Sequence, residues 1–318
     1  MNKYGFQRLL NSIVFIHLIL FIMCSTLKSN VNISSSYTQT SEVEQSIINE
    51  IVERYAPVLY FSKDEDYFPI EVGSFFDHSQ LMKRRAFPFK DQVMSDTVNP
   101  ALFTLYSNDD FYIRLKKDTF KSIKENYKNT KDKYRKTVYS NVIRIDEHPT
   151  VSYVVQYWLF FWGSKAGSIN LTWHQCDWEM FMISLNETFE PIEAGYSQHY
   201  YGDVKTWAEV CKHDVQPVVY VARGSHALYF TPGKHKAYYD NGKKWRLGND
   251  ICETSLQWTP DDYQVVILND SLKWLNFEGY WGSLTTTKLQ GPKYRNPKDR
   301  ALIMWENPVG WFEKYKKP

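Results

Sequence analysis

Residues 173–185 read WHQCDWEMFMISL and place a histidine and two carboxylates directly before an apolar run. In a strand, whose side chains alternate with a period of two, Asp177 and Glu179 would share one face and Trp178 would lie on the other. Both carboxylates would then lie among residues that are typical of a core. His174 would lie in a loop just before the strand, from which its imidazole could turn toward them. Because Asp and Glu are rarely buried without partners, this stretch predicts either a hydrogen-bonded network or a bound cation.

Several other runs are short, rich in Val, Ile, Tyr, Phe and Trp, and bounded by turn residues, as strands are. The clearest are PVLYF at 57–61, VSYVVQYWLFFW at 151–162, QPVVYVA at 216–222 and YQVVIL at 263–268. Helical periodicity is sparse between them, which argues against alternating βαβ units. The sequence therefore predicts a mainly β protein, an antiparallel β-sandwich with long loops and a few short helices.

One helix is predicted before the first strand. Ser41 and Glu44 have the spacing of a capping box, and apolar residues then recur at helical spacing until Pro57. A short amphipathic helix is expected to open the folded domain and to pack on its core.

Composition bounds the partners of this chain. Of 318 residues, 43% are hydrophobic and 17% aromatic, which is ample for a large packed core. Lys and Arg number 38 against 36 Asp and Glu, so no charge excess favours nucleic acid. The oligomeric state cannot be read from these features.

The N-terminus has the layout of a secretory leader. Residues 1–24 combine a basic start with a short apolar run, and residues 25–41 form a polar linker. We expect a cleaved signal peptide and a secreted protein, with residues 42–318 as a single β-sandwich domain. The alternative is a retained anchor that keeps the protein on a membrane of the secretory pathway or vacuole.

Sequons and cysteines agree with secretion. Asn-x-Ser/Thr sequons predict glycosylation at Asn32, Asn170, Asn186 and Asn269. Beyond the leader remain Cys176, Cys211 and Cys252, which allow one disulfide and one free thiol, with the pairing left open.

Two further segments offer polar side chains for a site near Asp177. In ARGSHALYF at 222–230, Gly224 permits a bend at a strand end, which could turn His226 toward the carboxylates. The predicted metal ligands are His174, Asp177, Glu179 and His226, and the predicted ligand-binding residues are Tyr196, Gln198, His199 and Ser225. An oxygen-rich set of this kind suits Mg²⁺ or Ca²⁺, with Mn²⁺ as an alternative. The competing interpretation is that the carboxylates accept backbone N–H groups or pair with Arg223.

Residues 115–136 hold nine basic and three acidic side chains. Phe120, Ile123 and Tyr127 could form one thin apolar stripe and make this segment a basic amphipathic helix that touches an anionic membrane. A solvated helix or loop is the other interpretation, and the sequence favours it.

Several motifs together resemble the vacuolar protein sorting-associated protein 62 family. They include YAPVLYF at 55–61, DEDYFP at 64–69, HQCDWE at 174–179, YSQH at 196–199 and GYWGS at 279–283. The family motifs read approximately Glu-x-Tyr-x-Pro, His-x-Gly-Asp-Trp-Glu and Gly-Ser-His-Ala, so Cys176 stands where the family has glycine.

The central motif also resembles the Gly-His-Arg-His-Asp-Trp-Glu heptapeptide of the necrosis-inducing cytolysins, which are secreted β-sandwiches. The resemblance implies that His174, Asp177 and Glu179 help to hold a divalent cation that supports binding to membrane sphingolipids. Trp173 replaces the leading glycine and Cys176 the second histidine of that heptapeptide.

The leading hypothesis is therefore a secreted, non-enzymatic β-sandwich whose divalent-cation site organises a surface for membrane lipid or glycan headgroups, in the manner of a cytolysin. A metal-dependent hydrolase with Glu179 or His226 as general base is the rival. A membrane-trafficking protein held by its N-terminal anchor is the third possibility.

Overall fold

The computed structural model describes residues 33–165, 174–199, 201–240, 244–283, 289–294 and 301–316. The chain divides into two compact units, residues 1–47 and residues 48–318. The predicted leader and two predicted glycosylation sites, Asn32 and Asn170, lie outside the described residues. Across the described ranges, none of the helices has the length and apolar character needed to cross a bilayer.

Helix α2 (Ile33–Arg54) is the first described element. It begins at Ile33 rather than at Ser41, so the predicted capping box is wrong: inside a helix, amides bond to carbonyls four residues back and need no cap. No proline or glycine interrupts residues 33–54, so the helix can extend through the polar stretch. At its end, Ile51 and Val52 are buried in the second unit.

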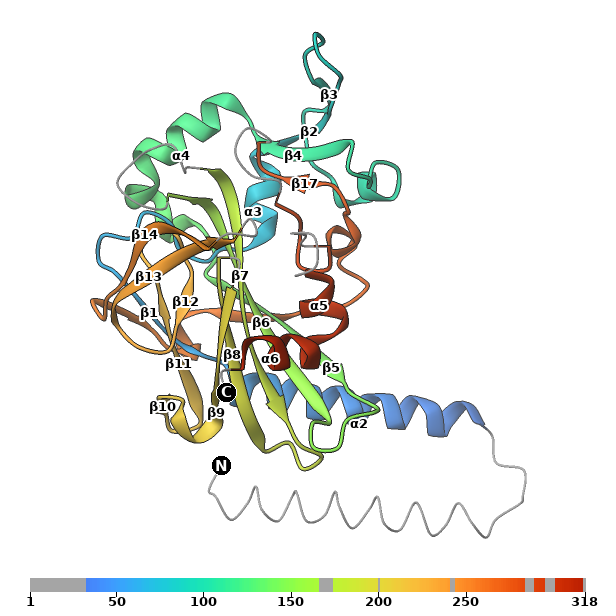
Figure 1. Cartoon of the computed structure of the whole chain (residues 1–318). Coiled ribbons are helices and arrows are strands. Elements are labelled where there is room, and N and C mark those ends of the chain that lie inside the picture. Colours follow the sequence, from blue (N-terminus) through green and yellow to red (C-terminus); the bar gives the residue numbers. More distant parts are fainter. Residues whose placement is uncertain are drawn as a thin grey trace. The chain divides into compact units, whose positions relative to one another are not determined.

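The main sheet of the second unit holds, in the described ranges, six strands (Figure 1). In spatial order they are β16 (Gln264–Ile267), β5 (Thr137–Arg144), β6 (Tyr153–Ser164), β7 (His174–Leu185), β8 (Pro191–Gln198) and β9 (Tyr201–Thr206). The β16–β5 pair is parallel and the others are antiparallel. β6 and β7 are almost wholly buried along their length, as their apolar sequences require.

A second sheet covers one face of the first. It consists of β10 (Lys212–His213), β11 (Gln216–Val221), β1 (Val58–Phe61), β15 (Leu256–Trp258) and, paired with β11, β12 (Leu228–Tyr229). The Tyr196 ring of the main sheet stacks on Phe230 at 3.8 Å, and its hydroxyl donates to the Val218 carbonyl. The two sheets therefore enclose a common core, which is the defining feature of a sandwich.

Helices cover the opposite face of the main sheet (Figure 1). They are α3 (Val72–Asp77), α5 (Ala301–Glu306) and α6 (Pro308–Tyr315). Phe75 of α3 packs edge-on against Phe160, and the Gln156 side chain donates to the Met304 carbonyl of α5. A Cβ at Gly195 would lie 2.4 Å from the Trp311 ring, so α6 packs against bare backbone of β8.

The remaining described elements extend this framework. They are the sheet β17 (Tyr280–Trp281), β4 (Phe111–Leu115), β2 (Ser79–Lys83) and β3 (Gln92–Ser95), the hairpin β13 (Gly233–Asp240) and β14 (Lys244–Cys252), helix α4 (Lys117–Thr130), and the 3₁₀ turns η1 (Pro100–Thr104), η2 (Lys131–Lys133), η4 (Trp207–Glu209), η5 (Pro260–Asp262) and η6 (Lys273–Asn276). The prediction of a mainly β, largely antiparallel sandwich with long loops and short helices is confirmed.

The basic segment at 115–136 contains α4. Ile123, from its predicted apolar stripe, is buried. At that residue the stripe packs on the protein, as the solvated-helix interpretation requires.

The described sequons lie in surface turns, and the described cysteines form no disulfide. Asn269 is exposed and Asn186 half-buried, each in a surface turn that its own side-chain oxygen helps to close. Cys176, Cys211 and Cys252 carry free thiols, the first and third of them buried. Burial raises the pKa of the Cys176 thiol well above its ordinary value, which keeps it protonated.

Candidate functional site

Strand β7 carries Asp177 and Glu179 on the face that looks toward the second sheet. The two residues pair across the ladder with Phe161 and Leu159 of β6, and only 5% and 3% of their surfaces are exposed. Trp178 points the other way and packs on Trp281. The predicted period of two is confirmed, and both carboxylates are buried in the sandwich.

His226 lies between two carboxylates that are far apart in the sequence. Its Nδ1 is 3.1 Å from Asp177 Oδ2, and its Nε2 is 3.5 Å from Glu65 Oε1. The imidazole is fully buried and stacks flat on Phe161 at 3.9 Å. The ring is therefore fixed on one face by an aromatic side chain and at both nitrogens by acidic groups.

These contacts set the charge of the three groups. Burial alone would lower the pKa of His226, but the Asp177 and Glu65 carboxylates outweigh burial and raise it from 6.5 to about 9. Burial would raise the pKa of Glu65, but His226 and the N–H groups of Gly224 and Tyr67 lower it instead. At neutral pH the cluster thus holds an imidazolium between two carboxylates.

Gly224 couples this cluster to the end of β6. Its backbone has φ +73°, and a Cβ would lie 2.3 Å from the Lys165 carbonyl oxygen. Its N–H donates to Glu65 at 2.8 Å, and its carbonyl accepts from Lys165 N–H at 2.7 Å. The predicted bend at Gly224 is present, and it directs His226 toward Asp177.

A second buried network lies beside the first and centres on Asp250 of β14. Asp250 accepts hydrogen bonds from Ser225 and Tyr229 hydroxyls, each at 2.7 Å, and lies 2.7 Å from His199 Nε2. Burial works against both charges, but the His199–Asp250 contact raises the pKa of His199 and lowers that of Asp250. The His199 side chain is 15% exposed, so this network extends to the surface.

The structure brings only some of the predicted site residues together. Asp177 contacts His226, whereas Glu179 accepts a hydrogen bond from Ser197 of β8. His174 is the first residue of β7 rather than part of a preceding loop, which corrects the prediction, and its Nδ1 lies 2.8 Å from the Cys176 carbonyl oxygen. The carbonyl of its own strand therefore orients the imidazole of His174.

Among the predicted ligand-binding residues, Tyr196 is fully buried. Its ring stacks on Phe230 and its hydroxyl donates to the Val218 carbonyl, so it does not face a ligand in solution. Gln198 and His199 are half-buried at the end of β8. Ser225 donates to Asp250 and so is tied to the network rather than paired with its neighbour His226 as a nucleophile.

Sequence reasoning missed Glu65, Tyr229 and Asp250. Glu65 lies in the DEDYFP motif, and Tyr229 lies four residues after Ser225 in the ARGSHALYF segment. Both segments had drawn attention for other residues. Asp250 had no local signal, since its polar strand resembles a loop. The competing partner, Arg223, lies 3.9 Å from Asp64.

Three of the five non-glycine residues that have a positive φ in the described ranges lie at these networks. Cys176, His199 and His226 have φ of 48°, 50° and 59°, in the left-handed region that non-glycine residues rarely adopt. Such residues persist only where their surroundings fix them, and they cluster at ligand and switch sites. Cys176 occupies the position at which the family motif carries glycine, so the positive φ explains the glycine.

We expect Cys176→Gly to change the free energy of unfolding by less than about 1 kcal/mol, because release of left-handed strain offsets the lost burial of the thiol. Cys252→Gly is the matched control, since Cys252 is also a buried strand residue but does not itself have a positive φ. That substitution should cost about 2 kcal/mol in urea unfolding. Equal losses would contradict the strain at Cys176.

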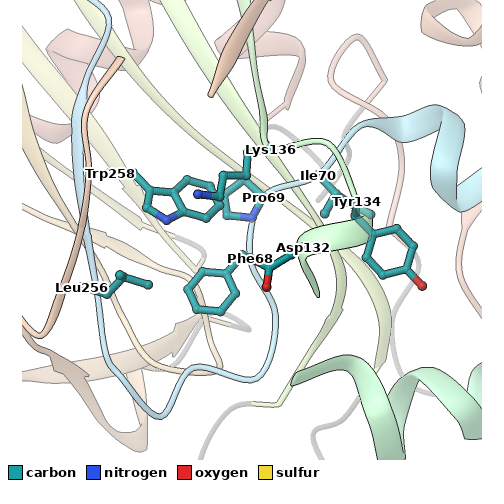
Figure 2. A pocket seen from close by; sticks show the side chains of 8 residues that line it. All are labelled: Phe68, Pro69, Ile70, Asp132, Tyr134, Lys136, Leu256 and Trp258. Carbon is teal, nitrogen blue, oxygen red and sulfur yellow. The ribbon is translucent and has the colours of Figure 1, made fainter. Parts of the chain in front are cut away.

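A small pocket lies elsewhere, between residues 68–70, residues 132–136 just before β5, and β15 (Figure 2). Its volume is about 80 Å³, well below the roughly 300–1,000 Å³ of typical ligand sites. Phe68 stacks on Trp258 at 5.5 Å, and the Lys136 ammonium lies 4.7 Å from the Trp258 ring. The indole is thus already covered by protein, and we assign the pocket no ligand.

The cation implied by the resemblance fits the carboxylates better than the histidines. Asp177 and Glu179 offer hard oxygen donors on one face, as Mg²⁺ and Ca²⁺ require. His226, when protonated, has no lone pair to give. Among the residues that the structure describes, no group of three or more His, Cys, Asp or Glu side chains is arranged to hold a metal ion. The cation stays a prediction.

Fold and site together define a β-sandwich protein with two neighbouring, buried carboxylate–imidazole networks. The model of the vacuolar protein sorting-associated protein 62 family matches residues 22–290, and the chain belongs to that family. No curated protein matches the sequence.

Some solved structures of necrosis-inducing proteins are similar to parts of this chain. "NLPPya in complex with glucosamine" is 18% identical over 30% of this chain and 44% of its own, with a TM-score of 0.24. Necrosis and Ethylene inducing Protein 2 from the causal agent of cocoa's Witches Broom disease is 13% identical over 57% and 67%, with a TM-score of 0.31. The "non-toxic HaNLP3 protein" is 15% identical over 51% and 63%, at 0.30. The chain thus spans less than half the length of the first, and no function is carried over from these likenesses.

Proposed function

We propose that this protein is a secreted, non-enzymatic binding protein for a membrane lipid or glycan headgroup, with a divalent cation at Asp177 and Glu179. The observation that supports it is the Asp250–His199 network, which lies beside the Asp177 cluster and reaches the surface at His199, just after β8. A half-buried imidazole that a buried carboxylate holds in its charged form can donate charge-assisted hydrogen bonds to hydroxyl-rich headgroups. Gln198 lies beside His199 and offers an amide to the same ligand.

The geometry favours binding over hydrolysis. A general base must reach the proton that it removes. His226 has no exposed surface and lies between Asp177 and Glu65, and Glu179 is 3% exposed and held by Ser197. Both bases of the hydrolase hypothesis are therefore remote from a substrate in solution.

The strained backbone at Cys176, His199 and His226 also supports a site at this place. In the proposal, the His226 imidazolium and the packing of Phe161 hold Asp177 in one orientation. The bound cation would neutralise the buried carboxylates, and the headgroup would bind where the neighbouring network reaches the surface, at Gln198 and His199.

The test is headgroup binding on glycan and lipid arrays with Ca²⁺, Mg²⁺ or chelator. Asp177→Asn/Glu179→Gln keeps side-chain volume and is expected to weaken binding at least about tenfold, as does chelator. Glu193→Gln is the control, because Glu193 is a buried carboxylate of β8 that pairs with Lys316 instead. Unchanged binding by the folded double variant would overturn the proposal.

Secretion is part of the proposal and has its own test. Asn186 and Asn269 lie in surface turns, within reach of the glycosylation machinery if the chain enters the secretory pathway. Treatment with an endoglycosidase should lower the apparent mass of the protein from its natural host, and Asn269→Gln should remove part of that shift. An unshifted mass would favour the trafficking alternative with a cytosolic domain.

A further inference from the structure

The loop between β2 and β3 exposes two aromatic rings that the rest of the protein does not cover. Phe87 is 96% exposed and Phe89 61% exposed, and Val93 at the start of β3 is 43% exposed. The hairpin projects from the second unit in Figure 1. Single exposed apolar residues are common on soluble proteins and need no explanation. Several exposed apolar side chains on one short loop form a patch, and such patches mark interaction surfaces.

Cations flank these rings. Residues 83–90 read KRRAFPFK, and Arg84, Arg85 and Lys90 are exposed. The Arg85 guanidinium lies 4.9 Å from the Phe89 ring. Positive charge and aromatic surface therefore occur at one convex tip, which is the composition of segments that bind the interface of anionic bilayers.

The tip is held in shape by its own hydrogen bonds. Phe89 N–H donates to the Ala86 carbonyl at 3.0 Å, and Arg85 N–H donates to Asp91 at 3.1 Å. The other Asp91 oxygen accepts from the Tyr112 hydroxyl of β4 at 2.7 Å. The one acidic group of the loop is thus bound at the base of the hairpin, and the exposed charges at its tip are positive.

The root of the hairpin is anchored in the fold. β2 pairs with β3 on one side and with β4 on the other, and Leu81 and Met82 are buried. Because the loop is already ordered, little conformational entropy is lost when it binds. A convex tip cannot enclose a small ligand, but it can enter a soft, flat surface.

We propose that this hairpin docks on an anionic lipid bilayer, with Phe87 and Phe89 at the boundary of headgroups and acyl chains and the Arg84, Arg85 and Lys90 side chains on lipid phosphates. This contact goes beyond the proposed headgroup site, since it needs neither the cation nor a glycan. It brings the protein to the membrane surface on which a headgroup would be recognised.

The experiment is vesicle flotation of the full protein with phosphatidylcholine vesicles, with and without phosphatidylserine. The wild type should bind the phosphatidylserine vesicles, and rising salt should weaken binding as the Debye length falls from about 10 Å to about 3 Å. Phe87→Ser/Phe89→Ser and Arg84→Glu/Arg85→Glu should each weaken it at least about tenfold. Phe87→Leu/Phe89→Leu should keep most of the wild-type vesicle binding, because leucine also partitions into lipid.

Lys117→Glu/Lys121→Glu is the matched control, since these exposed lysines of α4 reverse as much charge outside the hairpin. That variant should bind like the wild type. If Lys117→Glu/Lys121→Glu lost vesicle binding while the hairpin variants kept it, the membrane contact would belong to α4 and the proposal would be overturned. Absence of wild-type binding to phosphatidylserine would also overturn it and leave a protein partner for the aromatic tip.

The same variants separate this inference from the headgroup site. Hairpin variants should keep binding to soluble glycan or headgroup, and Asp177→Asn/Glu179→Gln should keep binding to phosphatidylserine vesicles. Loss of vesicle binding in the Asp177→Asn/Glu179→Gln variant, with the fold intact, would contradict an independent hairpin contact.

Discussion

Replacing His226 by leucine is expected to lower the free energy of unfolding by about 3–5 kcal/mol. The substitution removes the imidazolium between Asp177 and Glu65. It leaves these two carboxylates, which are 5% and 2% exposed, without that positive charge in an apolar core. Breaking one side of a buried ion pair costs more than the pair contributes, because the remaining charge stays desolvated. Urea unfolding followed by tryptophan fluorescence measures the loss.

Two comparisons give this result its meaning. His213→Leu alters an exposed histidine and should stay within about 0.5 kcal/mol of the wild type. Adding Glu65→Gln and Asp177→Asn to His226→Leu should recover part of the loss, because the unpaired charges disappear with the imidazolium. A loss below about 1 kcal/mol in His226→Leu would contradict the buried ion triad.

The second large effect is a fall in stability between pH 6.5 and pH 9, measured in chelator. The folded pKa of His226, about 9, exceeds the unfolded value of 6.5, so the folded state binds its proton more tightly. Its contribution is fully present below pH 6.5 and is lost as the pH rises to 9. A shift of this size corresponds to about 3 kcal/mol.

The acid side has the opposite sign. The pKa of Glu65 is lowered in the fold, so its contribution is present above about pH 4.5 and is lost as the pH falls further. Stability should therefore be greatest between about pH 4.5 and 6.5. His226→Gln should flatten the alkaline limb, and an alkaline limb of equal slope in that variant would assign it to another group.

Strand periodicity made much of the central sheet predictable. The apolar run at 151–162 became β6, which begins at Tyr153 and continues to Ser164, and the run at 178–185 became β7, which begins four residues earlier at His174. Local apolarity could not show that extension, because HQC at 174–176 is held in the sheet by pairing with β6. The β13–β14 hairpin was missed for a related reason, since its charged sequence lacks a clean alternation.

The candidate site was predictable only where neighbours in the sequence are neighbours in space. Asp177 and Glu179 share a face because strand side chains alternate with a period of two. The position of His226 follows from the bend that Gly224 permits at the strand end. Glu65 and Asp250 reach the site through strand packing between distant segments, which no local pattern encodes. His174 was placed beside the carboxylates by its position just before the strand and by the resemblance, but its Nδ1 lies 2.8 Å from the Cys176 carbonyl oxygen instead.

The most direct test of the proposed function is the divalent-metal content of the purified protein, measured together with its melting temperature before and after chelation. We expect a bound divalent ion whose removal lowers the melting temperature, because a ligand of the native state must stabilise it. The Asp177→Asn/Glu179→Gln variant should lack the ion, and chelator should not change its melting temperature. No ion and no chelator effect would contradict the cation. The WHQCDWE stretch would then be a hydrogen-bonded network in which the His226 imidazolium alone neutralises the buried carboxylates.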